Sequence, residues 1–123
     1  MGAAIHVLIF VMESRLWLQP RIWRRFGVRG QQDAETIAPM AYNQGFYNLF
    51  LAIGALLGVI LFASATAPPA GPTLMFFSSG CMVFAALVLV TSSPRLARAA
   101  LVQGLAPALG TLLLAIGLIG QST

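Results

Sequence analysis

Four apolar runs, separated by short segments rich in arginine or in helix-breaking residues, divide the whole chain. They cover about residues 3–18, 39–62, 73–90 and 97–119. A helix needs about 20 apolar residues to cross the hydrocarbon core of a bilayer, and each run meets or approaches that length. Lipid offers the backbone no hydrogen bonds, so such runs must become helices. We predict a single all-α domain, residues 1–123: a polytopic membrane protein with four transmembrane helices in an antiparallel bundle.

The charges give the expected orientation. Only 8% of the residues are charged and 59% are hydrophobic, whereas about a quarter are charged in soluble domains. All seven basic residues are arginines. One lies at the end of the first run, four lie in the connection after it, and two lie around the connection between the third and fourth runs; none lies in the uncharged connection 67–72. Because arginine-rich connections stay in the cytoplasm, both termini are expected to be extracytoplasmic. The arginines form no stripe on a soluble fold, so no nucleic-acid partner is expected.

Polar side chains interrupt the runs at one depth. The candidate catalytic residues are Glu13 in the first run, Asn43, Gln44, Tyr47 and Asn48 in the second, and Gln103 in the fourth. In a helix the spacings 43/47 and 44/48 are i,i+4, so the four residues of the second run share one broad face. At about 1.5 Å of rise per residue, all six positions fall in the cytoplasmic half of the bilayer. We expect three helices to bring them together.

Glu13 is the most informative of these residues. A carboxylate at membrane depth costs at least about 3 kcal/mol unless it is paired. We therefore expect Glu13 to be protonated or to receive hydrogen bonds from neighbouring amides. A carboxylic acid that stays protonated can serve as a general acid, and it can also carry protons. The alternative is that the amides hold helices together and have no chemical role.

Four further side chains are expected to line a substrate pocket around this acid: His6, Phe10, Trp17 and Phe46. His6 precedes Glu13 by seven residues and Trp17 follows it by four, so both fall on nearly the same helical face. Aromatic rings near a buried acid would stabilise a cationic intermediate through their π faces. The alternative for His6 is that it lies near a helix end, makes its hydrogen bonds there and binds no ligand.

No metal and no cofactor is predicted. One histidine, one acid within the apolar runs and the lone Cys81 do not make a set of three or four ligands. A single cysteine also excludes a disulfide framework. No glycine-rich phosphate loop or Ser-His-Asp set is present. The expected partners are the lipid bilayer and a lipophilic small molecule, with assembly into a homo-oligomer left open.

Three motif stretches resemble a known family. They are His6-x6-Glu13-x3-Trp17-x2-Pro20, Asn43-Gln-Gly-x-Tyr-Asn48-x-Phe-Leu-Ala52 and Val102-Gln-Gly-x-x-Pro-Ala108. Together they are similar to the small bacterial membrane proteins grouped as domain of unknown function 1304. The resemblance covers nearly the whole chain. It implies a four-helix protein of the bacterial cytoplasmic membrane with these positions in its signature, and it implies no activity.

Three functions remain open. In the first, the protein is an intramembrane enzyme without a cofactor, and protonated Glu13 donates a proton to an alkene or epoxide. The reaction would be isoprenoid cyclisation or double-bond isomerisation, in analogy to membrane-embedded terpene cyclases and sterol isomerases. In the second, the polar groups specify assembly of a structural or accessory subunit. In the third, the chain is a proton-coupled exporter that looks like the small multidrug resistance transporters.

Overall fold

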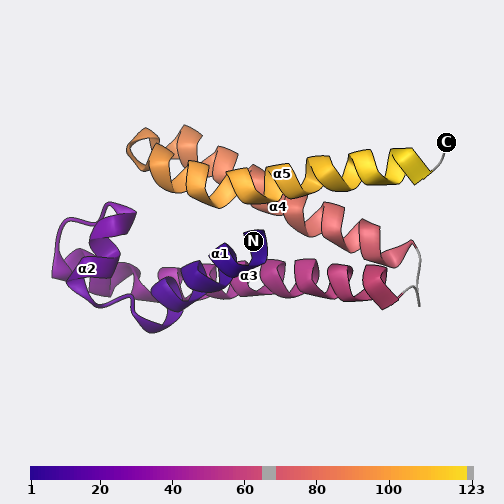
Figure 1. The fold of residues 1–123 in the computed structure, drawn as a ribbon. Helices are drawn as coiled ribbons and strands as arrows, with labels where there is room; N and C mark the ends of the chain where they lie inside the picture. The colour runs from indigo at the N-terminus through magenta and orange to yellow at the C-terminus, as the bar shows by residue number, and fades with distance from the viewer. Residues whose placement is uncertain (65–68, 122–123) are drawn as a thin grey trace.

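The computed structural model describes residues 1–64 and 69–121, and these residues are almost entirely helical (Figure 1). The elements are α1 (Gly2–Phe10), the π-helix η1 (Val11–Arg15), α2 (Pro20–Trp23), the 3-10 helix η2 (Arg24–Phe26), α3 (Gln31–Ser64), α4 (Ala70–Ser92), the 3-10 helix η3 (Pro94–Leu96) and α5 (Ala97–Gln121). The described ranges contain no strand, which confirms the prediction of an all-helical chain. Part of the expected connection 67–72 lies outside the described residues.

Three helical stretches are long and apolar enough to cross a membrane: Gln31–Ser64, Ala70–Ser92 and Pro94–Gly120. Large apolar side chains such as Phe50 and Phe77 are exposed on them, which suits helices surrounded by lipid. The N-terminal segment is shorter. Its nine α-helical and five π-helical residues are fewer than the about 20 that a spanning helix needs. The chain is therefore of the membrane type, with three long apolar helices and a shorter N-terminal one.

Two helix boundaries differ from those expected. The sequence predicts one helix over residues 3–18, but the α-helix ends at Phe10 and continues as a π-helix only to Arg15. The sequence also predicts a helix from residue 39, whereas α3 begins at Gln31 and contains Pro39. A proline inside a helix removes one backbone hydrogen bond. Here the interruption falls in the polar, exposed first turns of α3, where water can bond the freed carbonyl.

Small residues let α3 and α4 pack closely. A Cβ added at Gly54 would come within 2.5 Å of Ser78 Oγ on α4. One added at Gly58 would come within 2.9 Å of the backbone nitrogen of Met75. The Gly54-x-x-x-Gly58 pattern of α3 is thus a close-packing face toward α4, as such patterns often are between membrane helices.

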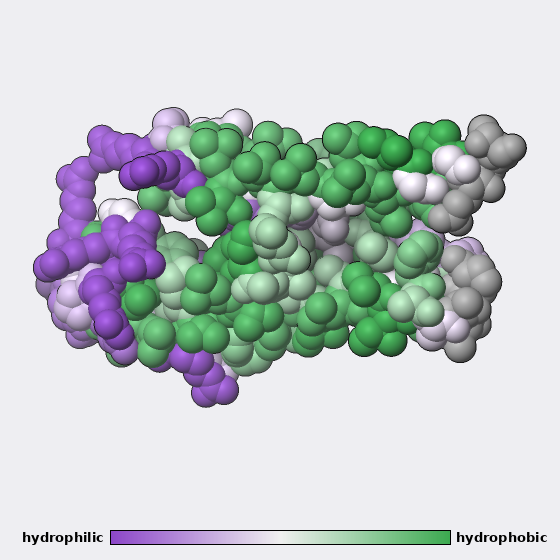
Figure 2. Space-filling view, viewed as in Figure 1, coloured by the Kyte–Doolittle hydropathy of each residue, from purple (hydrophilic) through white to green (hydrophobic). Residues whose placement is uncertain are grey.

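The arginine-rich connection between η1 and α3 is a folded unit rather than a loop, and we call its residues, 16–30, the cap. Its apolar core joins Trp17 and Trp23 to Ala34 and Ala41 of α3. Trp17 Nε1 donates a hydrogen bond of 2.8 Å to the carbonyl of Ala34. The cap lies at one end of the molecule, beside the start of α3 (Figure 1), and that end carries the largest hydrophilic surface in the view (Figure 2).

Candidate functional site

Glu13 lies in the middle of the π-helix η1. The N–H of Leu16 reaches the carbonyl of Val11, five residues back, at 3.1 Å. Such i→i+5 segments are rare and occur frequently at functional sites. The wider turn also changes which side chains share a face, so α-helical spacing does not apply between Glu13 and the residues after it.

An amide of α3 holds the Glu13 carboxyl group. Asn48 Nδ2 donates a hydrogen bond to Glu13 Oε2 at 3.0 Å and another to the backbone carbonyl of Gln44 at 3.1 Å. Both side chains are buried, with Glu13 7% exposed and Asn48 5% exposed. Among residues 1–64 and 69–121, Glu13 takes part in no ion pair. The acid is therefore bonded by a neutral donor rather than neutralised by an arginine.

Gly45 allows η1 to approach α3 this closely. A Cβ at this position would overlap Ser14 Oγ and would come within 3.2 Å of both Glu13 Cβ and the Phe10 carbonyl oxygen. Ser14 Oγ adds a second link, because it donates a hydrogen bond of 2.9 Å to the carbonyl of Tyr42. The position of Glu13 thus depends on a glycine in the facing helix.

A cavity of about 880 Å³ lies beside Glu13. It is lined by Ile5, Leu8 and Ile9 of α1, Met12 and Glu13 of η1, Arg25 and Phe26 of η2, Gln44 and Asn48 of α3, Ala85, Val88, Leu89 and Ser92 of α4, Leu96 of η3, and Arg98, Ala99, Val102 and Gln103 of α5. Sites for small molecules usually measure about 300–1,000 Å³ and are mainly apolar with a few polar groups. This cavity has both properties.

Several polar atoms at the cavity have no protein partner. Glu13 Oε2 is bonded by Asn48, whereas Oε1 accepts no hydrogen bond from any residue that the structure describes. The side-chain amides of Gln44 and Gln103 also make none within the described ranges. Amides that served only to join helices would bond each other across the bundle. One carboxyl oxygen and two amides are instead available to a molecule in the cavity.

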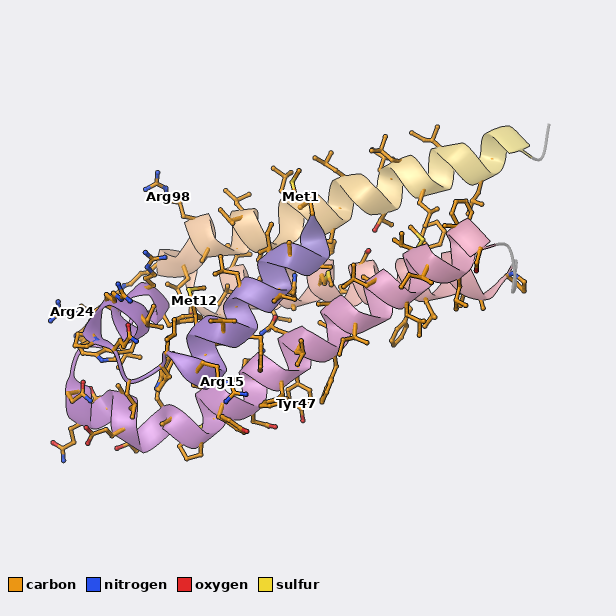
Figure 3. All side chains as sticks on the ribbon, turned by 60° about the horizontal axis from the view of Figure 1, so that its bottom comes forward. Met1, Met12, Arg15, Arg24, Tyr47 and Arg98 are labelled. Atoms are coloured by element: carbon orange, nitrogen blue, oxygen red, sulfur yellow. The ribbon has the colours of Figure 1, made fainter. Side chains whose placement is uncertain are left out.

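The structure brings together four of the six candidate catalytic residues: Glu13, Gln44, Asn48 and Gln103. Asn43 and Tyr47 do not line the cavity. Both are exposed, and Tyr47 points outward from α3 (Figure 3). The i,i+4 spacing places these residues on one broad face, but only the part that carries Gln44 and Asn48 faces the cavity.

None of the four residues expected to line the pocket does so. Phe10 and Phe46 pack against each other with ring centroids 5.1 Å apart, and Trp17 belongs to the core of the cap. His6 is fully buried, donates a hydrogen bond of 3.0 Å from Nδ1 to the Gly2 carbonyl, and leaves Nε2 without a partner in the described part of the chain. The π-helix explains the difference for Trp17, because it breaks the α-helical face that would have carried Trp17 beside Glu13.

Sequence reasoning missed the residues that shape the cavity instead. Met12, Phe26, Arg25 and Arg98 all line it. The two arginines carry a signal in the sequence, since Arg25 lies in the first charged connection and Arg98 directly follows the second one, but that signal by itself indicates only orientation. Arg24 and Arg98 project from the same end of the molecule (Figure 3). At that end hydrophilic residues surround an opening (Figure 2).

No group of three or more histidine, cysteine, aspartate or glutamate side chains able to hold a metal occurs among the described residues. The groups at hand are one acid with a free oxygen, amides that can orient a substrate, and apolar walls. This arrangement can donate a proton to a hydrophobic molecule and take one back.

A family model described as "Protein of unknown function (DUF1304)" matches residues 1–115, nearly the whole chain. No curated protein and no solved structure matches this chain.

Proposed function

The chain belongs to the DUF1304 family, and we propose that it is an integral membrane enzyme on a lipophilic, isoprenoid-type substrate, with Glu13 as proton donor. The reaction is acid-catalysed double-bond isomerisation or cyclisation and uses no cofactor. One observation carries the proposal: a buried carboxyl group with a free Oε1 faces a largely apolar cavity of about 880 Å³. An acid placed this way can reach a carbon–carbon double bond of a molecule that lies against these apolar walls.

The chemistry follows from the positions of the groups. The protonated carboxyl group gives its proton to one carbon of a double bond, and the adjacent carbon becomes cationic. The resulting carboxylate then removes a proton from a neighbouring carbon, so the double bond has moved and Glu13 is protonated again. Asn48 keeps the carboxyl group oriented through Oε2. The free amides of Gln44 and Gln103 turn their oxygen atoms toward the developing positive charge.

The composition of the wall favours isomerisation over cyclisation. A multi-step cyclisation passes through several carbocations, which aromatic faces stabilise. Phe26 is the one aromatic side chain among the described residues that line the cavity. A single, short-lived cation next to the carboxylate needs fewer such rings.

Exchange with heavy water tests the proposal directly. The purified protein in lipid nanodiscs is incubated in D2O with a panel of isoprenoids, and deuterium at carbon is measured by mass spectrometry. We expect incorporation with the wild type, none with Glu13→Gln, and wild-type levels with the control Glu35→Gln, whose acid is exposed on α3. Equal incorporation by the wild type and Glu13→Gln would overturn the assignment of Glu13.

A second function, a structural or accessory subunit, is favoured by one observation. The bond between Asn48 and Glu13 ties η1 to α3, and such bonds between membrane helices contribute to stability. In that case Glu13→Gln changes assembly or melting temperature, and the wild type incorporates no deuterium into any substrate.

We also propose the membrane arrangement. The chain crosses the bacterial cytoplasmic membrane four times as an antiparallel bundle, with α1 and η1 as the shorter first crossing, and both termini are extracytoplasmic. Support comes from the arginines, because the cap and η3 lie at the same end of the molecule (Figure 1). That end is cytoplasmic by the positive-inside rule.

A further inference from the structure

We infer that the cavity binds a single-chain amphiphile whose head group is a phosphate, held by Arg25 and Arg98. The inference rests on the proposed function, because it names the substrate class of the same site. Both arginines line the cavity that contains Glu13, one from η2 in the cap and the other from the first turn of α5.

Neither arginine is used by the protein itself. Arg21 donates a hydrogen bond to Gln19, and Arg24 lies over the Trp23 ring at 5.2 Å. Arg25 and Arg98 are exposed and, like Arg15, Arg29 and Arg95, make no hydrogen bond, ion pair or ring contact within residues 1–64 and 69–121; they differ from those three in lining the cavity. The one carboxyl group among the described residues of the cavity wall is Glu13, and it is bonded by Asn48. Neither arginine therefore has an ion-pair partner among the described residues at this end of the cavity.

Two guanidinium groups from different elements suit a phosphate better than a carboxylate. A phosphate monoester carries a charge of about −1.5 to −2 at neutral pH and offers three acceptor oxygens. Each arginine can form a forked pair of hydrogen bonds with such a group. A carboxylate carries a single charge and two oxygens, so one arginine would already satisfy it.

The cavity walls away from the two arginines indicate what the rest of the ligand is made of. Arg25, Ser92 and Arg98 lie at the hydrophilic end, and Ile5 and Ala85 lie farther along their helices. From Ser92 back to Ala85 the rise is about 10 Å at 1.5 Å per residue. These deeper positions are apolar, which fits a hydrocarbon chain. Gln103, on the second turn of α5, is only a few residues from Arg98, so the reacting double bond lies close to the head group rather than at the far end of the chain.

Binding of three probes to the full chain in uncharged detergent micelles tests the inference. The probes are farnesyl phosphate, farnesol and farnesoic acid, which share one chain and differ in the head group. We expect the wild type to bind farnesyl phosphate at least about tenfold more tightly than farnesol, as charge-assisted hydrogen bonds allow. Farnesoic acid should fall between them.

Variants assign the effect to the two arginines. Arg25→Gln and Arg98→Gln should each reduce the preference for phosphate, and the double variant should abolish it while leaving farnesol binding unchanged. Unchanged farnesol binding also shows that the cavity is still folded. The matched controls are Arg21→Gln in α2 and Arg95→Gln in η3, which do not line the cavity and should keep the preference.

Three results would overturn the inference: equal affinity of the wild type for all three probes, equal affinity for farnesoic acid and farnesyl phosphate, or an equal loss in the control variants. The proposed function fails separately. If Glu13→Gln and the wild type both prefer farnesyl phosphate but neither incorporates deuterium, the head-group assignment is supported and the enzyme is not. If the wild type incorporates deuterium but shows no preference for farnesyl phosphate, the enzyme is supported and the head-group assignment is not.

Discussion

Asn48 Nδ2 on α3 lies 3.0 Å from Glu13 Oε2 on the π-helix η1, and this bond joins residues 35 positions apart in the sequence. It connects the short N-terminal helix to the longest helix of the protein at the wall of the cavity. It leaves Glu13 Oε1 without a hydrogen-bond partner among the described residues, in a side chain that lines that cavity. Because the donor is a neutral amide, the bond orients the carboxyl group without requiring it to be ionised.

The first prediction concerns Asn48→Ala. The change leaves a buried carboxyl group without its donor, and we expect a loss of about 0.6–2 kcal/mol in the free energy of unfolding, the range found for hydrogen bonds between membrane helices. Unfolding in mixed micelles, followed by circular dichroism, measures it. Asn43→Ala serves as the control, because Asn43 is exposed and should cost less. Equal effects of the two substitutions would show that the bond does not stabilise the fold.

The second prediction concerns Gly45→Ala. The new methyl group would meet Ser14 and the Cβ of Glu13, so η1 must move away from α3. We expect a destabilisation of about 1–3 kcal/mol, as overpacking usually causes, together with loss of deuterium incorporation. For the control Gly110→Ala, an added Cβ meets nothing within 4 Å. Full activity of Gly45→Ala would mean that Glu13 needs no fixed position.

The third prediction concerns Gln44→Leu and Gln103→Leu. Neither amide makes a side-chain hydrogen bond to a described residue, so removing it should change stability by no more than about 0.5 kcal/mol. The rate of deuterium incorporation should nevertheless fall about tenfold, which corresponds to about 1.4 kcal/mol of lost transition-state stabilisation. Melting temperature and rate are measured on the same samples. A large drop in stability with an unchanged rate would favour the structural role of these amides.

The fourth prediction concerns Trp17→Phe. This substitution keeps an aromatic ring but removes the hydrogen bond of 2.8 Å to the Ala34 carbonyl. We expect the cap to lose about 1 kcal/mol of stability, seen as faster hydrogen exchange in residues 16–30. The rate per folded molecule should stay near that of the wild type, because Trp17 does not line the cavity. If the reaction rate fell while hydrogen exchange in residues 16–30 stayed at the wild-type level, Trp17 would have a role in the reaction and not only in the cap.

The fifth prediction tests the orientation. Cys81 is first replaced by serine, and single cysteines are placed at the two ends of α3 as Gln32→Cys and Ala63→Cys. In intact cells a membrane-impermeant maleimide should label position 63 and spare position 32, because the proposed orientation places the arginine-rich end in the cytoplasm. The reversed pattern would invert the proposed orientation. Labelling of both positions would contradict a crossing by α3.

Much of the candidate site is predictable from local patterns. An ionisable group in an apolar run is expensive to bury, so the apolar neighbours of Glu13 are enough to single it out. Depth along a helix follows from the rise per residue, which predicts Gln44, Asn48 and Gln103 near the level of Glu13, and all three line its cavity. The prediction fails where it depends on direction around the helix axis. Asn43 and Tyr47 are adjacent in the sequence to Gln44 and Asn48, but they do not line the cavity that Gln44 and Asn48 line.

By itself the sequence determined that the chain is all-helical and of the membrane type, and it singled out Glu13, Gln44, Asn48 and Gln103, which line one cavity. Hydropathy and helical rise are local properties, and they hold whatever the helices pack against. Only the tertiary structure decided that η1 is a π-helix, that Trp17 lies in the cap, and that Arg25 and Arg98 line the cavity of Glu13. These features depend on contacts between distant segments, such as η1 against Gly45. No local pattern encodes them.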